Sequence, residues 1–148
     1  MVIEKFPSLE TADEHGLLAV GGDLDSESLL VAYSSGIFPW PLNDRLLAWF
    51  SPPRRAVLPF QNLHISKSLQ KERKRTNYTY RFDYNFEAVI RACSEVVNRG
   101  RQDGTWITPG MIKAYCRLHR EGFAHSLACY DKDELIGGLY GVCIGAMF

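Results

Sequence analysis

The sequence lacks the features that mark membrane-spanning, exported and metal-binding proteins. Its longest stretch without a charged residue, residues 28–43, contains Gly36, Pro39 and Pro41 and cannot form a membrane-spanning helix. No basic stretch followed by an apolar one opens the chain, so no export signal is recognisable and we expect a cytoplasmic protein without membrane contact. The four cysteines include no Cys-x-x-Cys pair, so we expect free thiols and no metal site.

Motifs of cofactor chemistry are also missing. The chain has neither a phosphate-binding P-loop nor a Gly-x-Gly-x-x-Gly segment, and no nucleophile stands beside an evident base. Gly137, Gly138 and Gly141 are more typical of a closely packed strand, and the glycine-rich coenzyme A loop of acetyltransferases is absent. We therefore expect no cofactor and disfavour a coenzyme A-dependent acyltransferase. His119 and His125 are six residues apart, a poor metal-site spacing, and we interpret them as structural or surface residues.

The formal net charge is zero, but the charges are distributed unevenly along the chain. Residues 1–30 contain seven acidic residues against Lys5 alone, whereas residues 54–75 contain seven basic residues against Glu72 alone. This asymmetry favours contact with a polyanion through one part of the molecule only.

Apolar periodicity and helix-capping signals predict a mixed fold. In the N-terminal third we expect two short strands and one helix, at residues 16–20, 46–50 and 26–35. A proline pair at residues 52–53 then indicates a domain boundary near residue 54. Beyond it we expect an extended segment at residues 56–58 and three helices at residues 66–75, 86–97 and 109–121. We also expect four strands, at residues 78–83, 126–130, 135–142 and 144–148. This order of elements indicates the α+β class.

Several segments of unusual composition make the chain similar to a known family. The most specific are Gly36-Ile37-Phe38-Pro39-Trp40-Pro41, Leu63-His64-Ile65-Ser66-Lys67-Ser68 and Asp103-Gly104-Thr105-Trp106-Ile107-Thr108-Pro109. Over nearly its whole length the chain resembles the bacterial leucyl/phenylalanyl-tRNA–protein transferases. The resemblance implies a small N-terminal α/β domain over residues 1–54. It also implies that residues 55–148 form the first part of an acetyltransferase-like (GNAT) domain.

The resemblance also implies a reaction. Members of the family transfer leucine or phenylalanine from aminoacyl-tRNA to a protein whose N-terminus is Arg or Lys, which marks that protein for degradation. An aminoacyl ester is already activated, so transfer mainly requires positioning, deprotonation of the amine and stabilisation of an oxyanion. In the family, this work belongs to an acidic residue and a glutamine near the C-terminus, and to a glutamate shortly after the position of Phe148. None of these positions lies within this chain, so no catalytic residue is assigned and we expect no transfer. The alternative function is a non-catalytic chain that binds tRNA 3′ ends.

Four basic residues share one face of the helix expected at residues 66–75: Lys67, Lys71, Lys74 and Arg75. Cations aligned in this way neutralise adjacent phosphates and give affinity without sequence readout. An ordinary solvated helix face is the alternative. The resemblance implies that these residues contact tRNA, with Gln70 standing where the family has a further basic residue.

Trp40 and Trp106 lie in segments rich in glycine and proline, which we interpret as turns. Indole rings stack on bases, and each stack contributes about 1–3 kcal/mol. Isolated tryptophans more often belong to a core, which is the alternative here. The resemblance implies that this pair lines the site for aminoacyl-adenosine.

Leu139, Tyr140 and Phe148 are apolar or aromatic residues on the strands expected at the C-terminal end. Residues of this type usually belong to a core. The resemblance implies that they form the walls of a pocket for the leucine or phenylalanine side chain, which would select by volume, at about 1–3 kcal/mol per methylene. The strand expected at residues 144–148 has no successor, so we also expect self-association through an exposed strand edge.

The basic row makes a direct prediction about tRNA binding. If it follows the phosphate backbone, affinity for tRNA falls steeply as salt is raised, and the Lys71→Glu/Lys74→Glu double variant binds more weakly than the parent. Filter binding across a salt series measures both effects. A salt-independent affinity would mean that the row is only a solvated helix face.

Overall fold

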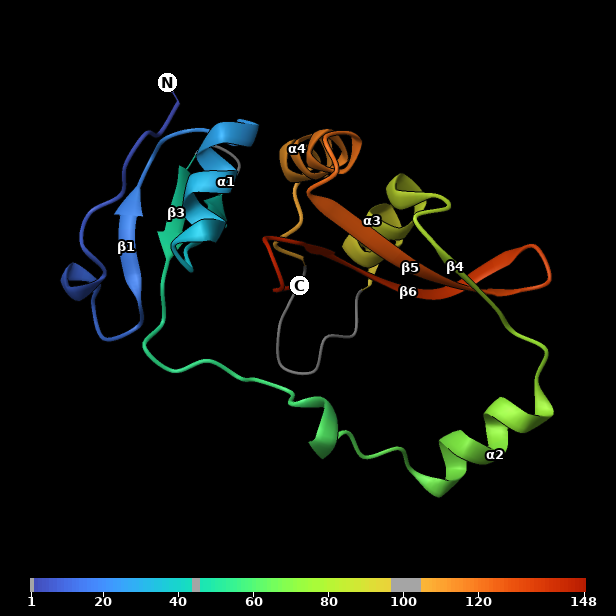
Figure 1. Cartoon of the computed structure of the whole chain (residues 1–148). Coiled ribbons are helices and arrows are strands. Elements are labelled where there is room, and N and C mark those ends of the chain that lie inside the picture. The colour runs from blue at the N-terminus through green and yellow to red at the C-terminus, as the bar shows by residue number, and fades with distance from the viewer. Residues whose placement is uncertain (1, 44–45, 97–104) are drawn as a thin grey trace.

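The computed structural model describes residues 2–43, 46–96 and 105–148, and within them the chain forms two three-stranded antiparallel sheets and four α-helices. Positions 97, 103 and 104, which belong to an expected helix and to the motif around Trp106, lie outside the described residues. Figure 1 shows the first sheet with α1 at one side, the second sheet with α3 at the other, and α4 between them. The predicted α+β class is confirmed, while the GNAT-like assignment stays a prediction.

The first sheet has the strand order β1-β3-β2. Its strands are β1 (Leu17–Val20), β2 (Phe38–Asn43) and β3 (Leu46–Phe50), and α1 (Ser26–Ser34) joins the first two. Helix α1 ends as expected because Gly36, with a φ of 71°, takes the left-handed conformation that directs the chain into β2. The strands and helix predicted for this region are confirmed, whereas β2 was not predicted.

The interpretation of Trp40 as a turn residue is wrong, because Trp40 lies within β2 and is paired with Ala48 of β3. Pro39 and Pro41 made the segment look like a turn. A proline has no N–H to give to a neighbouring strand, but an edge strand needs such donors at every second residue only. Pro39 and Pro41 are two residues apart on the edge strand β2, so both fit without breaking the ladder.

Residues 51–78 leave the first sheet and carry two short elements, η2 (Phe60–Asn62) and α2 (Lys67–Arg75). The predicted helix is confirmed, and the Ser66 hydroxyl caps it by accepting a hydrogen bond from the Leu69 N–H at 3.2 Å. No residue of α2 is buried, and the helix lies away from the rest of the molecule (Figure 1). The extended segment expected at 56–58 forms no strand.

The second sheet has the strand order β4-β5-β6. Its elements follow in the order β4 (Thr79–Phe82), α3 (Phe86–Glu95), α4 (Pro109–Arg120), β5 (Ala124–Asp131) and β6 (Glu134–Val142). Both helices pack on the face where every second residue of β5 is buried. The opposite face is open, so the half-buried strand expected at 78–83 instead exposes Tyr80 by 56% and Phe82 by 66%. The strand expected at 144–148 is wrong as well, since this segment forms only an isolated bridge between Ile144 and Met147.

One hydrophobic core connects the two sheets through α4. Six of the twelve residues of α4 are buried, more than one side of a surface helix would bury. Met111 and Tyr115 belong to the same cluster as Leu29 of α1, Trp49 of β3 and Ile90 of α3. The domain boundary near residue 54 stays a prediction, and the core extends across it.

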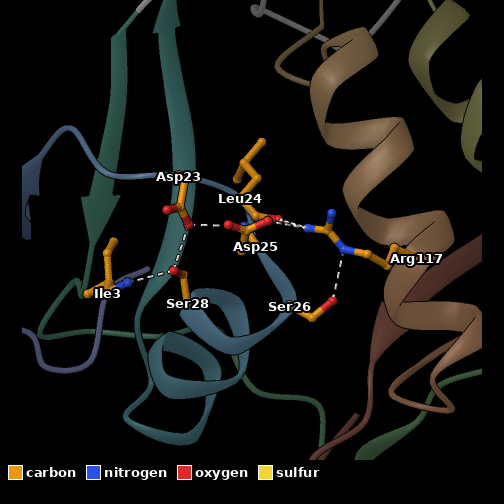
Figure 2. A network of polar contacts seen from close by, with 7 residues as sticks. All are labelled: Ile3, Asp23, Leu24, Asp25, Ser26, Ser28 and Arg117. Carbon is orange, nitrogen blue, oxygen red and sulfur yellow. Dashed lines mark hydrogen bonds and ion pairs between the residues drawn. The ribbon is translucent and has the colours of Figure 1, made fainter. Parts of the chain in front are cut away.

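A polar network fixes the start of α1 against α4 (Figure 2). The Arg117 guanidinium donates to the carbonyl of Leu24 at 2.6 Å and to the Ser26 hydroxyl at 3.0 Å, and it pairs with the Asp25 carboxylate at 3.3 Å. Asp25 occupies the N-cap position of α1, but its side chain caps no helical N–H. The side chains of Asp25 and Ser26 thus both bind Arg117.

The buried hydroxyl of Ser28 extends this network to the N-terminal segment of the chain. It donates to the Asp23 carboxylate at 2.7 Å and accepts from the Ile3 N–H at 2.8 Å, as Figure 2 shows. Burial by itself would raise the pKa of Asp23, but the hydrogen bonds from Ser28 and from the Asp25 N–H keep that pKa below its ordinary value. Asp23 is therefore charged at neutral pH and holds the turn that precedes α1.

Asp83 directly follows β4, and its side chain is hydrogen-bonded to β5. Its backbone has an unusual conformation, with a φ of 50°. Its carboxylate accepts hydrogen bonds from the Ser126 N–H at 2.7 Å and from Nδ1 of His125 at 2.6 Å. His119 donates to the carbonyl of Ala124 at 2.7 Å, with its Nδ1 3.9 Å from Asp83. Both histidines thus have structural contacts, in line with their interpretation from the sequence.

Among the described residues, no helix is both long and apolar enough to cross a membrane. In the same part of the chain, no three His, Cys, Asp or Glu side chains are grouped so that they could hold a metal ion. All four cysteines are free thiols, and Cys116 is buried, which raises its pKa.

Replacing Asp83 by asparagine tests the Asp83 junction. Burial raises the pKa of Asp83, but the hydrogen bonds from His125 and Ser126 and the nearby imidazoles outweigh it and lower the pKa below 3.8. The charged form therefore stabilises the fold above the unfolded-state pKa, and this contribution is lost as the pH falls through the folded-state pKa. Asparagine tolerates a positive φ equally well, so Asp83→Asn removes the charge without adding backbone strain.

We expect Asp83→Asn to lower the free energy of unfolding by about 1–2 kcal/mol near pH 6. Urea unfolding of both proteins measures it, and the difference should shrink below about pH 4. A difference that is as large at pH 3 as at pH 6 would show that the stabilisation does not come from the charge.

Candidate functional site

The two predicted tryptophans lie against each other. The ring centroids of Trp40 and Trp106 are 5.2 Å apart and their planes differ by 18°, which is a stacked arrangement. Trp40 comes from the edge strand β2, and Trp106 comes from the segment just before α4. Two residues far apart in the sequence therefore form a single aromatic surface.

The segment that carries Trp106 is fixed at both ends. The side chain of Ile107 is buried, and its N–H donates to the Thr105 hydroxyl at 3.1 Å. Thr108 caps α4 by accepting from the Met111 N–H at 3.3 Å. Helix α4 therefore begins at Pro109, as predicted, and the cap fixes the turn that follows Trp106.

An apolar pocket of about 560 Å³ lies beside this pair, between β6 and the segment that follows α1. Leu139, Tyr140 and Phe148 all line it, and so does Trp106, whereas Trp40 does not. The ring of Phe148 folds back onto β6 over Gly141, where a Cβ atom would come within 2.8 Å of the ring. The structure thus brings the three predicted pocket residues together, and only glycine at position 141 leaves room for Phe148.

Two tyrosine hydroxyls meet next to the apolar pocket. The hydroxyl of Tyr33, a lining residue, is hydrogen-bonded to the hydroxyl of Tyr115, whose side chain is 1% exposed. Burial raises the pKa of Tyr33 and raises that of Tyr115 well above its usual value. The ring of Tyr115 also packs edge-on against Tyr140, with centroids 5.8 Å apart. At neutral pH these phenols are protonated, so they can donate hydrogen bonds but cannot act as bases.

Arg55 is the one charged residue among the described residues that line the apolar pocket. Its guanidinium lies over the ring of Phe38, 5.3 Å from the centroid. It donates to the carbonyls of Gly36 and Pro52 and to the Ser51 hydroxyl. The side chain is therefore held in one orientation at the pocket.

A second cavity, the polar pocket, has a volume of about 700 Å³ and lies between the turn before α1 and the first turns of α4. Its charged lining residues are Asp23, Asp25, Lys113 and Arg117, so its formal charges balance. None of the predicted site residues lines it. Arg117 and Asp25 are already engaged with each other there, which makes this cavity part of the α1–α4 contact.

The predicted tRNA-binding row is exposed on α2, with Lys67, Lys71, Lys74 and Arg75 all open to solvent. One of the four is partly neutralised, since Arg75 lies 3.5 Å from Glu72 one helical turn earlier. Figure 1 places α2 far from β6, so the basic row and the apolar pocket are separate surfaces.

Stacked tryptophans next to an apolar pocket define a class of site suited to a ligand with a flat base and an apolar side chain. Comparison with known proteins gives the family of the chain. Residues 57–148 match the family model for leucyl/phenylalanyl-tRNA protein transferase, and residues 22–53 match the model for the N-terminal domain of the same family. The chain belongs to this family.

Individual relatives are about half identical to the chain. It is 50% identical over 143 residues to the leucyl/phenylalanyl-tRNA–protein transferase of Anaeromyxobacter sp. (strain Fw109-5), covering 97% of this chain and 60% of that protein. It is 49% identical over 145 residues to the protein of the same name from Pseudomonas fluorescens (strain Pf0-1), a match that covers 97% of this chain. It is 50% identical over 145 residues to that of Myxococcus xanthus (strain DK1622), a match that covers 98% of this chain. These matches cover 63% and 62% of the two relatives, so the chain spans about three fifths of their length.

Two groups of residues at the site escaped the sequence analysis. Tyr33 and Tyr115 lie in the helices predicted at residues 26–35 and 109–121 but were assigned no role at a site. A signal was available, because a buried tyrosine hydroxyl needs a hydrogen-bond partner. Two tyrosines on the apolar sides of two helices could therefore have been predicted to bond to each other. Arg55 gave no signal of its own, since its contacts with Gly36 and Phe38 depend on how β2 and β3 pair.

The stacked pair predicts a spectroscopic signature. Two nearly parallel indoles at this distance couple their ultraviolet transitions and produce a paired positive and negative band in circular dichroism. Trp40→Phe and Trp106→Phe should each remove this band, and the double variant should remove nothing further. Trp49 stays in every variant and supplies the uncoupled background. A band that survives either single replacement would show that the two rings do not stack in solution.

Proposed function

We propose that the tryptophan pair and the apolar pocket bind the aminoacyl-adenosine end of leucyl-tRNA or phenylalanyl-tRNA. In the cytoplasm, the bound amino acid would be destined for the N-terminal Arg or Lys of an acceptor protein, which is then degraded. The observation that carries the proposal is the double role of Trp106. It belongs both to the aromatic stack and to the wall of the pocket that Leu139, Tyr140 and Phe148 line.

The chemistry of the ligand matches the chemistry of the site. An adenine ring stacks on indole, and the side chain of leucine or phenylalanine packs well against apolar walls. Such walls select by volume and shape, so they discriminate only weakly against β-branched or small side chains. The Tyr33 hydroxyl, held by Tyr115, is a donor suited to the ester carbonyl. A pocket of about 560 Å³ is within the usual range for small ligands, which is roughly 300–1,000 Å³.

The basic row on α2 supports a role for the rest of the tRNA. Lys67, Lys71, Lys74 and Arg75 are exposed and far from the apolar pocket, which suits contact with the nucleic acid backbone at a distance from its 3′ end. The names of the relatives also support tRNA as the donor.

Binding and transfer are separate steps, and the described residues favour binding. Among the described residues that line the apolar pocket there is no Asp, Glu or His, and Tyr33 stays protonated at neutral pH because burial raises its pKa. The carboxylates and imidazoles that commonly take a proton from an amine are therefore missing among these described residues. We propose that these 148 residues bind and orient the donor, and that they do not transfer it by themselves.

Puromycin, an aminoacyl-adenosine mimic, tests the binding site. Titrating it should quench tryptophan fluorescence, and Trp106→Ala should weaken binding by about 1–3 kcal/mol because one stacking surface is lost. Calorimetry gives the two dissociation constants. If Trp106→Ala binds puromycin as tightly as the parent, the proposed site is wrong.

A transfer assay distinguishes the enzyme from the binding protein. Labelled leucyl-tRNA is mixed with an Arg-headed acceptor protein and the 148-residue chain, and we expect no labelled acceptor above background. Transfer above background would mean that a proton acceptor for the reaction lies within these residues.

We also propose that the chain self-associates through β6, the longest strand of the second sheet and one of its edges. Leu139, Met147 and Phe148 add exposed apolar surface near this edge. Unpaired strand edges of this kind favour pairing between chains. Light scattering should therefore give a mass above 16.8 kDa that rises with protein concentration. A monodisperse monomer would contradict the proposal.

A further inference from the structure

We propose that Arg55 binds the 5′-phosphate of the terminal nucleotide whose aminoacylated ribose occupies the apolar pocket. This inference rests on the proposed function and adds a contact to it. Arg55 would be a binding and positioning residue that fixes which way the nucleotide enters the pocket.

The first observation is the charge of the apolar pocket. All its other described lining side chains are apolar or aromatic or belong to glycine, so Arg55 is the one charged side chain at the pocket. Within the described part of the chain, no carboxylate lies close enough to pair with Arg55. An apolar pocket with one uncompensated cation fits a ligand that combines an apolar part with an anion.

The second observation is the orientation of the guanidinium. Arginine has five N–H donors, of which Nε donates to the Pro52 carbonyl and Nη2 to the Gly36 carbonyl and the Ser51 hydroxyl. The two N–H groups of Nη1 have no acceptor among the described residues. The plane of the group is fixed by Phe38, which itself lines the pocket. The two N–H groups of Nη1 thus remain for an anion, and the fixed side chain has little entropy left to lose on binding.

The third observation is the position of Arg55 in the chain. Arg55 lines the apolar pocket and is also near the start of the segment that leads through residues 56–66 to the exposed basic row on α2. A nucleic acid strand that ends in the pocket must bring a phosphate to its mouth before its remaining phosphates can reach α2. Arg55 is the cation that the structure offers at that point.

Puromycin and puromycin 5′-monophosphate test the inference, because they differ only in the phosphate. At low salt, we expect the parent chain to bind the monophosphate about tenfold more tightly than puromycin. Arg55→Gln should reduce this ratio to about one, and because the ratio is taken within each variant, any change in puromycin binding itself cancels. Arg54→Gln is the matched control, since Arg54 is the adjacent exposed arginine and does not line the pocket, and it should keep the full ratio.

The outcomes separate this inference from the proposed function. Puromycin binding without any gain from the phosphate, or a gain that survives in Arg55→Gln, overturns the role of Arg55 and leaves the proposed function intact. Failure of the parent to bind puromycin overturns the proposed function itself. Arg55→Lys covers the case in which Arg55→Gln also weakens puromycin binding. If Arg55→Lys restores puromycin binding and part of the phosphate gain, the inference holds, and if it restores only puromycin binding, Arg55 is a structural residue.

Discussion

The packing of α1 against α4 is the contact on which the rest of this structure depends. It combines the hydroxyl pair of Tyr33 and Tyr115, the shared hydrophobic core and the bonds from Arg117 to the turn before α1. Hydrogen bonds to a charged group contribute about 1.5–3 kcal/mol when the alternative is an unsatisfied charge, so Arg117 is a strong link between segments more than 90 residues apart. Without this contact the first sheet would have no fixed position relative to the second.

The proposed site exists only because of that fixed position. Trp40 belongs to the first sheet, Trp106 precedes α4, and Leu139 belongs to the second sheet, so the aromatic stack and the apolar pocket are assembled across the α1–α4 contact. Tyr33 takes part in both, because its hydroxyl bonds to Tyr115 and its side chain lines the pocket. The same side chains therefore stabilise the fold and shape the surface that we propose for aminoacyl-adenosine.

Local signals in the sequence were enough to predict most of the elements, whereas the proposed site residues came from the family resemblance and stay proposals. Capping by Ser66 and Thr108 and the stop at Gly36 involve neighbouring residues only, so the helices they bound were predicted within a few positions. Strand β2 was missed because prolines on an edge strand look like turn residues. The stacking of Trp40 on Trp106 and the contacts of Arg55 join segments that meet only in the folded chain, and no local pattern encodes them.

The most direct test of this account is native-state hydrogen exchange, which measures the free energy of opening of each element. If the α1–α4 contact unites the fold, the slowest amides of α1 and of β5 should open with the same free energy, equal to that of global unfolding. Arg117→Met should lower both by the same amount. Independent opening of α1, at a free energy well below that of β5, would contradict the account, because the first sheet would then fold and move apart from the second.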